Sequence, residues 1–210
     1  MTGTIERFRI EVADSVLEDL RSRLAQTRFP DHIAGSGWED GIPIDYLREL
    51  VSYWRDTYDW RAQESQLNTF AHFRTSIDSQ SIHFIHARSA HQDAFPLLMT
   101  HGWPGSVVEF LEAIPRLTDP EAHGGGSADA FHVVAPSLPG YGFSEPTRTR
   151  GWGVRRIALA FIELLHRLGY ARYGAQGGDW GAQVATRIGA LDPDRCAAIH
   201  LNMPIGERPE

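Results

Sequence analysis

Gly177-Gly178-Asp179-Trp180-Gly181 lies between a short apolar run and a segment with helical periodicity. The spacing is that of a nucleophile elbow, Gly-x-nucleophile-x-Gly, in which a strand turns sharply into a helix. Side chains two positions to either side of Asp179 would collide in such a turn, so small residues are needed there. The stretch therefore predicts an α/β fold that presents Asp179 as a nucleophile.

The carboxylate of Asp179 suits a different reaction from the serine that an esterase carries at this position. A serine alkoxide attacks a carbonyl, whereas a carboxylate can displace a leaving group at a saturated carbon and become an ester itself. Epoxides and alkyl halides are therefore the expected substrates. The alternative is an ordinary aspartate at a helix start, where Asp is favoured, but the flanking glycines argue against it.

Composition narrows the class of protein. With 210 residues and 42% hydrophobic content, the chain can bury a substantial core, so we expect one domain or two. A net charge of -7 without a basic run argues against a nucleic-acid partner. The single cysteine, Cys196, cannot form an internal disulfide and fits a reducing cytoplasm. No apolar stretch approaches the roughly 20 residues of a membrane span, so a soluble cytoplasmic protein is expected. We also expect that the protein uses no metal and no cofactor.

Apolar periodicity predicts two helices at the start of the chain. One runs from Ser15 to Gln26, where Ser15 and Glu18 form a capping box, and the other begins at Asp45 and reaches Tyr58. From residue 73 strands and helices alternate, which predicts a parallel sheet covered on both faces. The expected strands are Phe73–Ile77, Ile82–Ala87, Phe95–Thr100, Phe131–Ala135, Tyr173–Gln176 and Cys196–Met203, and the expected helices are Val107–Leu117, Val154–Leu168 and Trp180–Leu191. The first two strands are expected to form a hairpin around the polar turn Asp78-Ser79-Gln80.

A second motif follows the expected strand that ends at Thr100, and it reads His101-Gly102-Trp103-Pro104-Gly105. An α/β-hydrolase builds one side of its oxyanion hole at this place. The donors must be main-chain N–H groups fixed by the turn, and the candidates are those of Trp103 and Trp180. We interpret His101 as a residue that fixes the turn rather than as a base.

A third motif, a tight turn rich in Gly and Pro, reads Ser137-Leu138-Pro139-Gly140-Tyr141-Gly142-Phe143-Ser144. From about residue 4 to its end, the chain resembles the epoxide hydrolases of the α/β-hydrolase fold in these three motifs. The N-terminal arm, with Trp54-Arg55 and Tyr58-Asp59-Trp60, is similar to the microsomal-type branch in bacteria. The resemblance implies a helical arm over residues 1–72. It implies the N-terminal half of a hydrolase core, a mostly parallel sheet flanked by helices, over residues 73–210.

The resemblance also implies a mechanism. Asp179 would open an epoxide and form an alkyl-enzyme ester, water would release a vicinal diol, and the Trp103 and Trp180 N–H groups would stabilise the oxyanion. Such enzymes serve detoxification or aromatic hydrocarbon catabolism. The family also needs a His base, its acidic partner and two lid tyrosines, and none is identifiable after Asp179. His200 lies in an apolar strand pattern, too early in the chain for the family base.

Two other functions stay open from the sequence. A haloalkane dehalogenase also places Trp after the elbow Asp, but it usually carries Asn or Thr around the oxyanion turn. The second alternative is a truncated, catalytically impaired or binding-only family member. If the chain stops after Cys196–Met203, that strand leaves an unpaired edge. We therefore expect self-association or a C-terminal companion chain.

Three further patterns are interpreted as structural. His123 with the three glycines after it copies a lipase oxyanion motif, but no strand precedes it, so we expect a flexible loop. Gly140 and Gly142 lack the third glycine and the helix of a dinucleotide site. His83 and His86 lie three residues apart on a strand and should face opposite sides, which disfavours a metal site.

Overall fold

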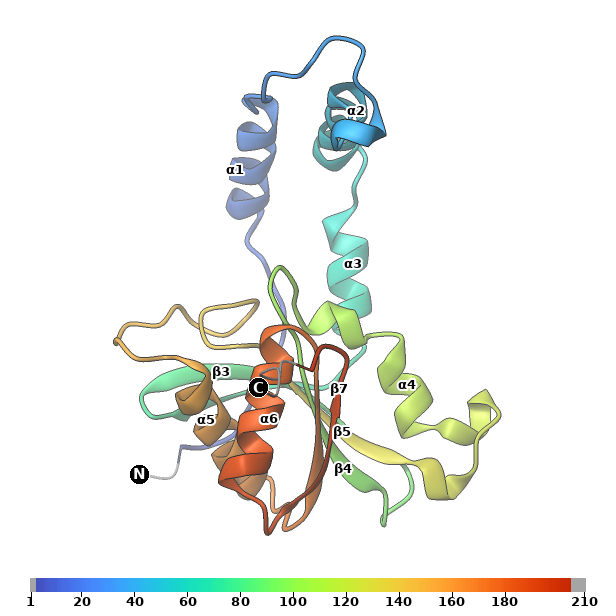
Figure 1. Cartoon of the computed structure of the whole chain (residues 1–210), viewed down its shortest axis with the longest axis vertical. Coiled ribbons are helices and arrows are strands. Elements are labelled where there is room, and N and C mark those ends of the chain that lie inside the picture. The colour runs from blue at the N-terminus through green and yellow to red at the C-terminus, as the bar shows by residue number, and fades with distance from the viewer. Residues whose placement is uncertain (1–2, 205–210) are drawn as a thin grey trace, which may run out of the picture. The chain divides into compact units, whose positions relative to one another are not determined.

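The structure is a computed structural model that describes residues 3–204 (Figure 1). The chain clusters into two compact units, which we describe separately. One unit contains the N-terminal segment up to Arg9 and the chain from Leu67 onward, and the other contains Ile10–Gln66. The sequence predicted a helical arm over residues 1–72, whereas Glu6–Phe8 form a strand of the larger unit.

Within residues 3–204, one seven-stranded sheet organises the larger unit. Its strands are β1 (Glu6–Phe8), β2 (His72–Ile77), β3 (Gln80–Ala87), β4 (Phe95–Thr100), β5 (Phe131–Pro136), β6 (Tyr173–Gly177) and β7 (Cys196–Leu201). The spatial order is β1-β2-β3-β5-β4-β6-β7. The last four strands in this order are parallel and β2 pairs antiparallel with β3, both as expected, whereas β1 is antiparallel to β2 and β3 is antiparallel to β5. The sheet is therefore mixed.

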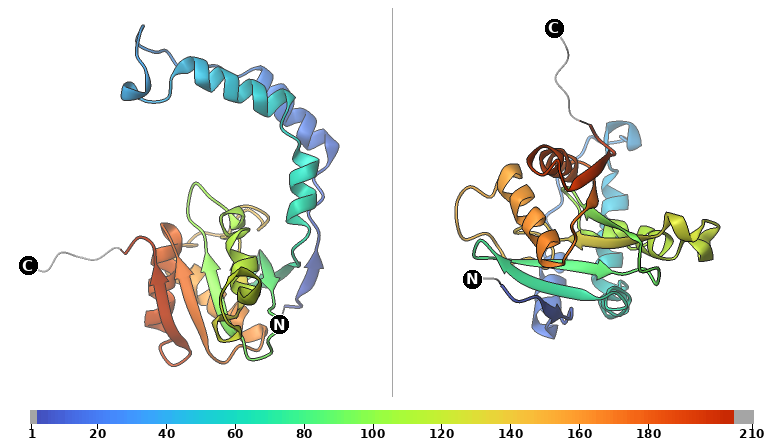
Figure 2. Two further views of the ribbon diagram at one scale, coloured as in Figure 1. Left: turned by 90° about the vertical axis from the view of Figure 1, so that its right-hand side faces the viewer. Right: turned by 90° about the horizontal axis from the view of Figure 1, so that it is seen from below.

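The helices of the larger unit cover both faces of the sheet, as the alternating pattern predicted (Figure 2). On one face, α5 (Val154–Arg167) and α6 (Trp180–Leu191) pack over a core that includes Phe84. On the other face, a smaller core contains Ile85. Successive strand residues point to opposite sides, so these two neighbours on β3 enter different cores.

The single helix expected over 107–117 is wrong, because the segment forms two short helices. A 3₁₀ helix, η2 (Val107–Phe110), is followed by α4 (Ala113–Thr118). Pro115 lies in the first turn of α4, where its missing N–H is tolerated. In one continuous helix its ring would clash with the carbonyl of Leu111, which explains the break.

The smaller unit is helical. It contains α1 (Asp14–Ala25), a 3₁₀ helix η1 (Trp38–Asp40), α2 (Ile44–Asp56) and most of α3 (Trp60–Leu67), which the sequence did not predict. The expected capping box is also wrong, because α1 begins at Asp14 with Ala13 at the N-cap and no side-chain cap bond.

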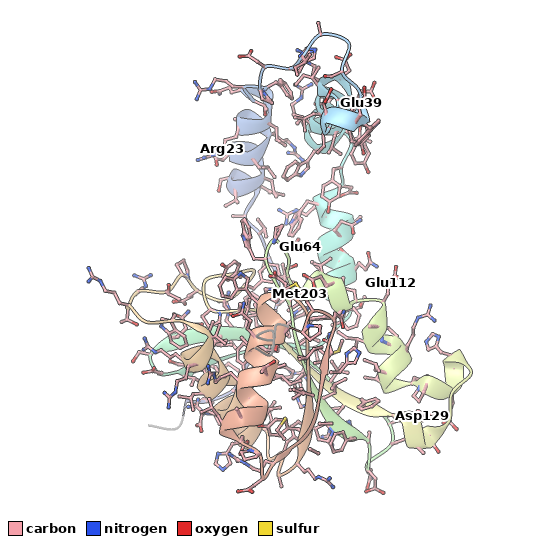
Figure 3. All side chains as sticks on the ribbon, in the orientation of Figure 1. Arg23, Glu39, Glu64, Glu112, Asp129 and Met203 are labelled. Carbon is pink, nitrogen blue, oxygen red and sulfur yellow. The ribbon has the colours of Figure 1, made fainter. Side chains whose placement is uncertain are left out.

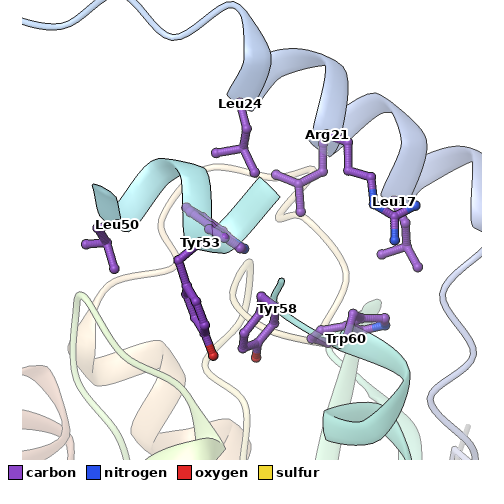
Figure 4. Close-up of a pocket in the computed structure, with 9 residues that line it drawn as sticks. Leu17, Arg21, Leu24, Leu50, Tyr53, Tyr58 and Trp60 are labelled. Carbon is purple, nitrogen blue, oxygen red and sulfur yellow. The ribbon is translucent and has the colours of Figure 1, made fainter. Parts of the chain in front are cut away.

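Glu64, labelled in Figure 3, ties this unit together. Its carboxylate accepts hydrogen bonds from the Val12 N–H (2.7 Å) and the Arg61 guanidinium (2.7 Å). A cavity of about 390 Å³ lies between the helices of the same unit (Figure 4). Its lining residues are Leu17, Leu20, Arg21, Leu24, Leu50, Tyr53, Trp54, Tyr58 and Trp60.

Candidate active site

The elbow lies where β6 ends and α6 begins. Asp179 is half-buried between them with φ +52° and ψ −124°, a backbone conformation that L-residues rarely adopt. A Cβ atom on Gly177 would lie 2.1 Å from the Gly181 carbonyl oxygen, and a Cβ on Gly181 would lie 1.9 Å from the Thr100 oxygen. Both positions therefore accept only glycine without a shift of backbone. Strain of this kind is typical of functional sites.

The second motif lies against the first. The Trp103 N–H donates a hydrogen bond of 2.8 Å to Asp179 Oδ1, and the Trp180 N–H also donates to the carboxylate. These two donors hold the pKa of the Asp179 carboxyl below its usual value, and the Trp103 N–H has the larger effect. A Cβ on Gly102 would lie 2.5 Å from the Asp179 Cβ, so the close approach requires glycine. The arrangement keeps an ionised carboxylate at neutral pH under two main-chain donors.

His101 is fully buried beneath this motif. One ring nitrogen, Nδ1, lies 2.9 Å from the Gly102 carbonyl oxygen, and Nε2 accepts a hydrogen bond of 3.0 Å from the Leu138 N–H. A carbonyl oxygen only accepts, so Nδ1 carries the proton and Nε2 is unprotonated. Both nitrogens are occupied, and burial lowers the pKa of the ring. His101 therefore joins two loops and offers no lone pair to a substrate. The neighbouring Trp103–Pro104 peptide is cis.

The third motif forms the tight turn that the sequence predicted. It follows β5, and Gly140 (φ +87°) and Gly142 (φ +52°) adopt the left-handed backbone conformation that favours glycine. The Tyr141 N–H bonds to the Leu138 oxygen at 2.9 Å, and the Tyr141 ring meets the His101 ring edge-on at 6.3 Å between centroids.

Other candidate residues lie elsewhere. His200 is exposed on β7 opposite Gln176, and no contact described for residues 3–204 joins it to Asp179. His123 ends a 3₁₀ helix, η3 (Pro120–His123), and a second one, η4 (Ser127–Asp129), follows shortly, so the segment is not an oxyanion loop after a strand.

His83 and His86 do face opposite sides of β3, because His83 contacts His72 and His86 contacts Tyr170. Residues 3–204 hold no group of three or more His, Cys, Asp or Glu side chains that could bind a metal. Over the same residues, every helix is too short or too polar to cross a membrane.

A cavity of about 640 Å³ lies over the sheet face beside η2 and α4. Strands β4, β6 and β7 line it with Met99, Gln176 and Ile199, and Ile199 is 43% exposed. Within the described residues, β7 pairs only with β6 and is an edge strand. Apolar surface on an edge strand favours association.

Two protein families match the chain. Residues 5–110 match the family described as "Epoxide hydrolase N terminus", and residues 96–210 match "alpha/beta hydrolase fold". A Stigmatella aurantiaca protein named "Putative epoxide hydrolase" is 54% identical over 201 residues, or 96% of this chain and 46% of the relative. "Epoxide hydrolase 1" of Sus scrofa is 40% identical over 206 residues, or 96% of this chain and 45% of the relative.

Solved structures give the same picture. Juvenile hormone epoxide hydrolase from Bombyx mori has a TM-score of 0.86 and 36% identity, covering 96% of this chain and 53% of that chain. Aspergillus niger epoxide hydrolase has a TM-score of 0.86 and 32% identity, covering 99% of this chain and 54% of that chain. The chain thus spans about half the length of the relatives it matches.

Proposed function

The chain belongs to the epoxide hydrolases of the α/β-hydrolase fold, and we propose that it carries the nucleophile and oxyanion hole of such an enzyme. The observation that carries the proposal is the hydrogen bond of 2.8 Å from the Trp103 N–H to Asp179 Oδ1. It joins two motifs that are 76 residues apart in sequence, and it acts on the carboxylate at a strained elbow.

In the first step, Asp179 Oδ2 attacks a carbon of the epoxide ring. The bond from that carbon to the ring oxygen breaks, and its electron pair leaves with the oxygen, which then takes a proton. The product is a 2-hydroxyalkyl ester of Asp179. The lowered pKa of Asp179 extends to lower pH the range in which the nucleophile is ionised, and protonation would remove the attacking electron pair.

In the second step, water attacks the ester carbonyl carbon and negative charge develops on Oδ1. The Trp103 and Trp180 N–H groups already point at the carboxylate, so they stabilise the oxyanion without rearrangement. Collapse of the intermediate breaks the Cγ–Oδ2 bond, the departing oxygen takes up a proton, and the diol leaves, so the regenerated carboxylate holds one oxygen from water. This step needs a base to take a proton from water. Both nitrogens of His101 are engaged, so we assign that base to no residue of the described chain.

Conversion of a strained, alkylating ring to a diol removes an electrophile. We propose detoxification, or the catabolism of aromatic hydrocarbons through their epoxides, as the role of the complete reaction. The epoxide hydrolases among the relatives favour an epoxide over an alkyl halide as substrate.

The test is the intact mass of the chain after incubation with a styrene-type epoxide. We expect a gain of one epoxide molecule per chain and slow release of diol, because no base for ester hydrolysis is assigned among residues 3–204. The Asp179→Asn variant should gain no mass at that site. A parallel incubation with a bromoalkane distinguishes the alternative, since rapid halide release without reaction of the epoxide would mean a dehalogenase.

A further inference from the structure

A chain of buried hydrogen bonds crosses the larger unit beside the active-site loops. His72 on β2 and His83 on β3 are 2% and 0% exposed, and Nδ1 of the first lies 2.8 Å from Nε2 of the second. At one end, His72 Nε2 lies 2.8 Å from the Leu67 carbonyl oxygen. At the other end, His83 Nδ1 lies 2.9 Å from the Ser137 hydroxyl.

The direction of this chain is fixed by its carbonyl end. The Leu67 oxygen can only accept, so His72 Nε2 carries the proton and neutral His72 accepts at Nδ1. His83 must then donate from Nε2, which leaves its Nδ1 as an acceptor for the Ser137 O–H. Each ring nitrogen therefore either donates or accepts one hydrogen bond. A buried network in which every donor has an acceptor holds its side chains in place.

The network fixes the turn of residues 137–144. The Ser137 N–H donates to the His83 carbonyl oxygen (2.9 Å), and the His83 N–H donates to Ser144 Oγ (3.0 Å). The Ser144 hydroxyl in turn donates to the Ser137 oxygen (2.9 Å), which closes the turn. Arg74 adds a bond of 2.9 Å to the Phe143 oxygen. Both ends of the turn are therefore tied to β3.

A series of hydrogen bonds connects this turn to Asp179. The residue after Ser137 is Leu138, whose N–H donates to His101 Nε2. His101 holds the Gly102 carbonyl, and the next residue, Trp103, donates its N–H to Asp179. The other donor, Trp180, begins α6 and has no part in this path.

We propose that His83, acting through Ser137, is a positioning residue for the Trp103 N–H that faces Asp179. The proposal rests on the proposed function, because the placement of this donor affects a reaction only if Asp179 forms an ester. The position of the Trp103 N–H should therefore depend on the network, whereas the position of the Trp180 N–H should not.

Residue-resolved hydrogen exchange of the whole chain tests this difference. In His83→Leu, the Trp103 amide should exchange about three to ten times faster than in the unchanged chain, the effect of losing one buried hydrogen bond. The Trp180 amide in the same sample should keep its rate. His86→Leu is the matched control, because His86 lies on the same strand and bonds to Tyr170 on the other face at 2.8 Å.

Ser137→Ala is the second variant, since it removes only the hydroxyl donor and perturbs the core less than His83→Leu. Selective acceleration at Trp103 in both variants, with no such change in His86→Leu, supports the proposal. A Trp103 amide that is unchanged in either variant, or equal acceleration at Trp103 and Trp180, overturns it.

The proposed function is tested separately by the adduct on Asp179. If the unchanged chain forms no adduct, the proposed function fails while the exchange result still stands. If the adduct forms and the Trp103 amide depends on His83, the variants should also slow hydrolysis of the ester, the step in which this N–H stabilises the oxyanion. A structural role alone would lower the melting temperature without slowing ester hydrolysis in the folded chain.

Discussion

Replacement of Gly181 by alanine adds a single methyl group, yet it should clearly lower the stability of the fold at the elbow. The added Cβ would lie 1.9 Å from the Thr100 oxygen, so β4 and α6 must separate by roughly 1.5 Å to reach an ordinary contact. Overpacking of this kind costs about 1–3 kcal/mol. For a chain of this length that cost lowers the melting temperature by about 2–12 °C.

The matched control is Gly126→Ala. A Cβ at Gly126 would lie 3.7 Å from Asp129 Oδ2, which is an ordinary contact. Gly125 is less suitable, because its Cβ would lie 3.0 Å from the Pro120 Cβ. Thermal unfolding of both variants, together with the rate of adduct formation, measures the effect. Equal melting temperatures for Gly181→Ala and Gly126→Ala would refute the steric argument.

Two other predictions concern acid and association. Burial lowers the pKa of His83 to about 3, so the unfolded state takes up its proton first as pH falls below 6.5. Stability should therefore be complete above pH 6.5 and fall by up to about 1.4 kcal/mol per pH unit towards pH 3. Denaturant unfolding at several pH values should show a smaller slope in His83→Gln but not in His166→Gln, whose side chain is 68% exposed; equal slopes would contradict the assignment. Among residues 3–204, β7 pairs on one side only and Ile199 is exposed, which predicts that the 210-residue chain self-associates. Light scattering after size-exclusion chromatography checks this, and a monomer with cooperative unfolding at every concentration would contradict it.

The elbow could be predicted because its pattern is local. The glycines around Asp179 lie within a few residues of one another, and the need for Gly177 follows from the turn itself. The need for Gly181 comes from the close approach of Thr100 on β4, which only the structure shows. The buried strands were also predictable, since apolar runs between turn residues are a local signal. The strand Glu6–Phe8 was missed because three residues carry no periodicity, and its contacts are long-range: pairing with β2 and packing of the Phe8 ring against His83.

The predictions of one helix across Pro115 and of a capping box at Ser15 were wrong, although the sequence holds a signal for the first. Proline disfavours a helix interior, so the break could have been predicted. The start of a helix is uncertain by one or two residues, so the sequence does not fix which residue is the N-cap. The hydrogen-bonded path from His83 to Trp103 depends on strand register and on contact between two loops that are far apart in the sequence. The spacing of residues along the chain does not indicate such a contact, so the path could not be predicted.

The most direct test of the account is the location of the covalent adduct. After incubation with a styrene-type epoxide, peptide mass spectrometry should find one epoxide molecule attached to Asp179 as an ester that alkaline hydroxylamine removes. The Asp179→Asn variant should lack this peptide adduct. A stable label on another residue, with Asp179 unmodified in the folded chain, would contradict the assignment of Asp179 as the nucleophile.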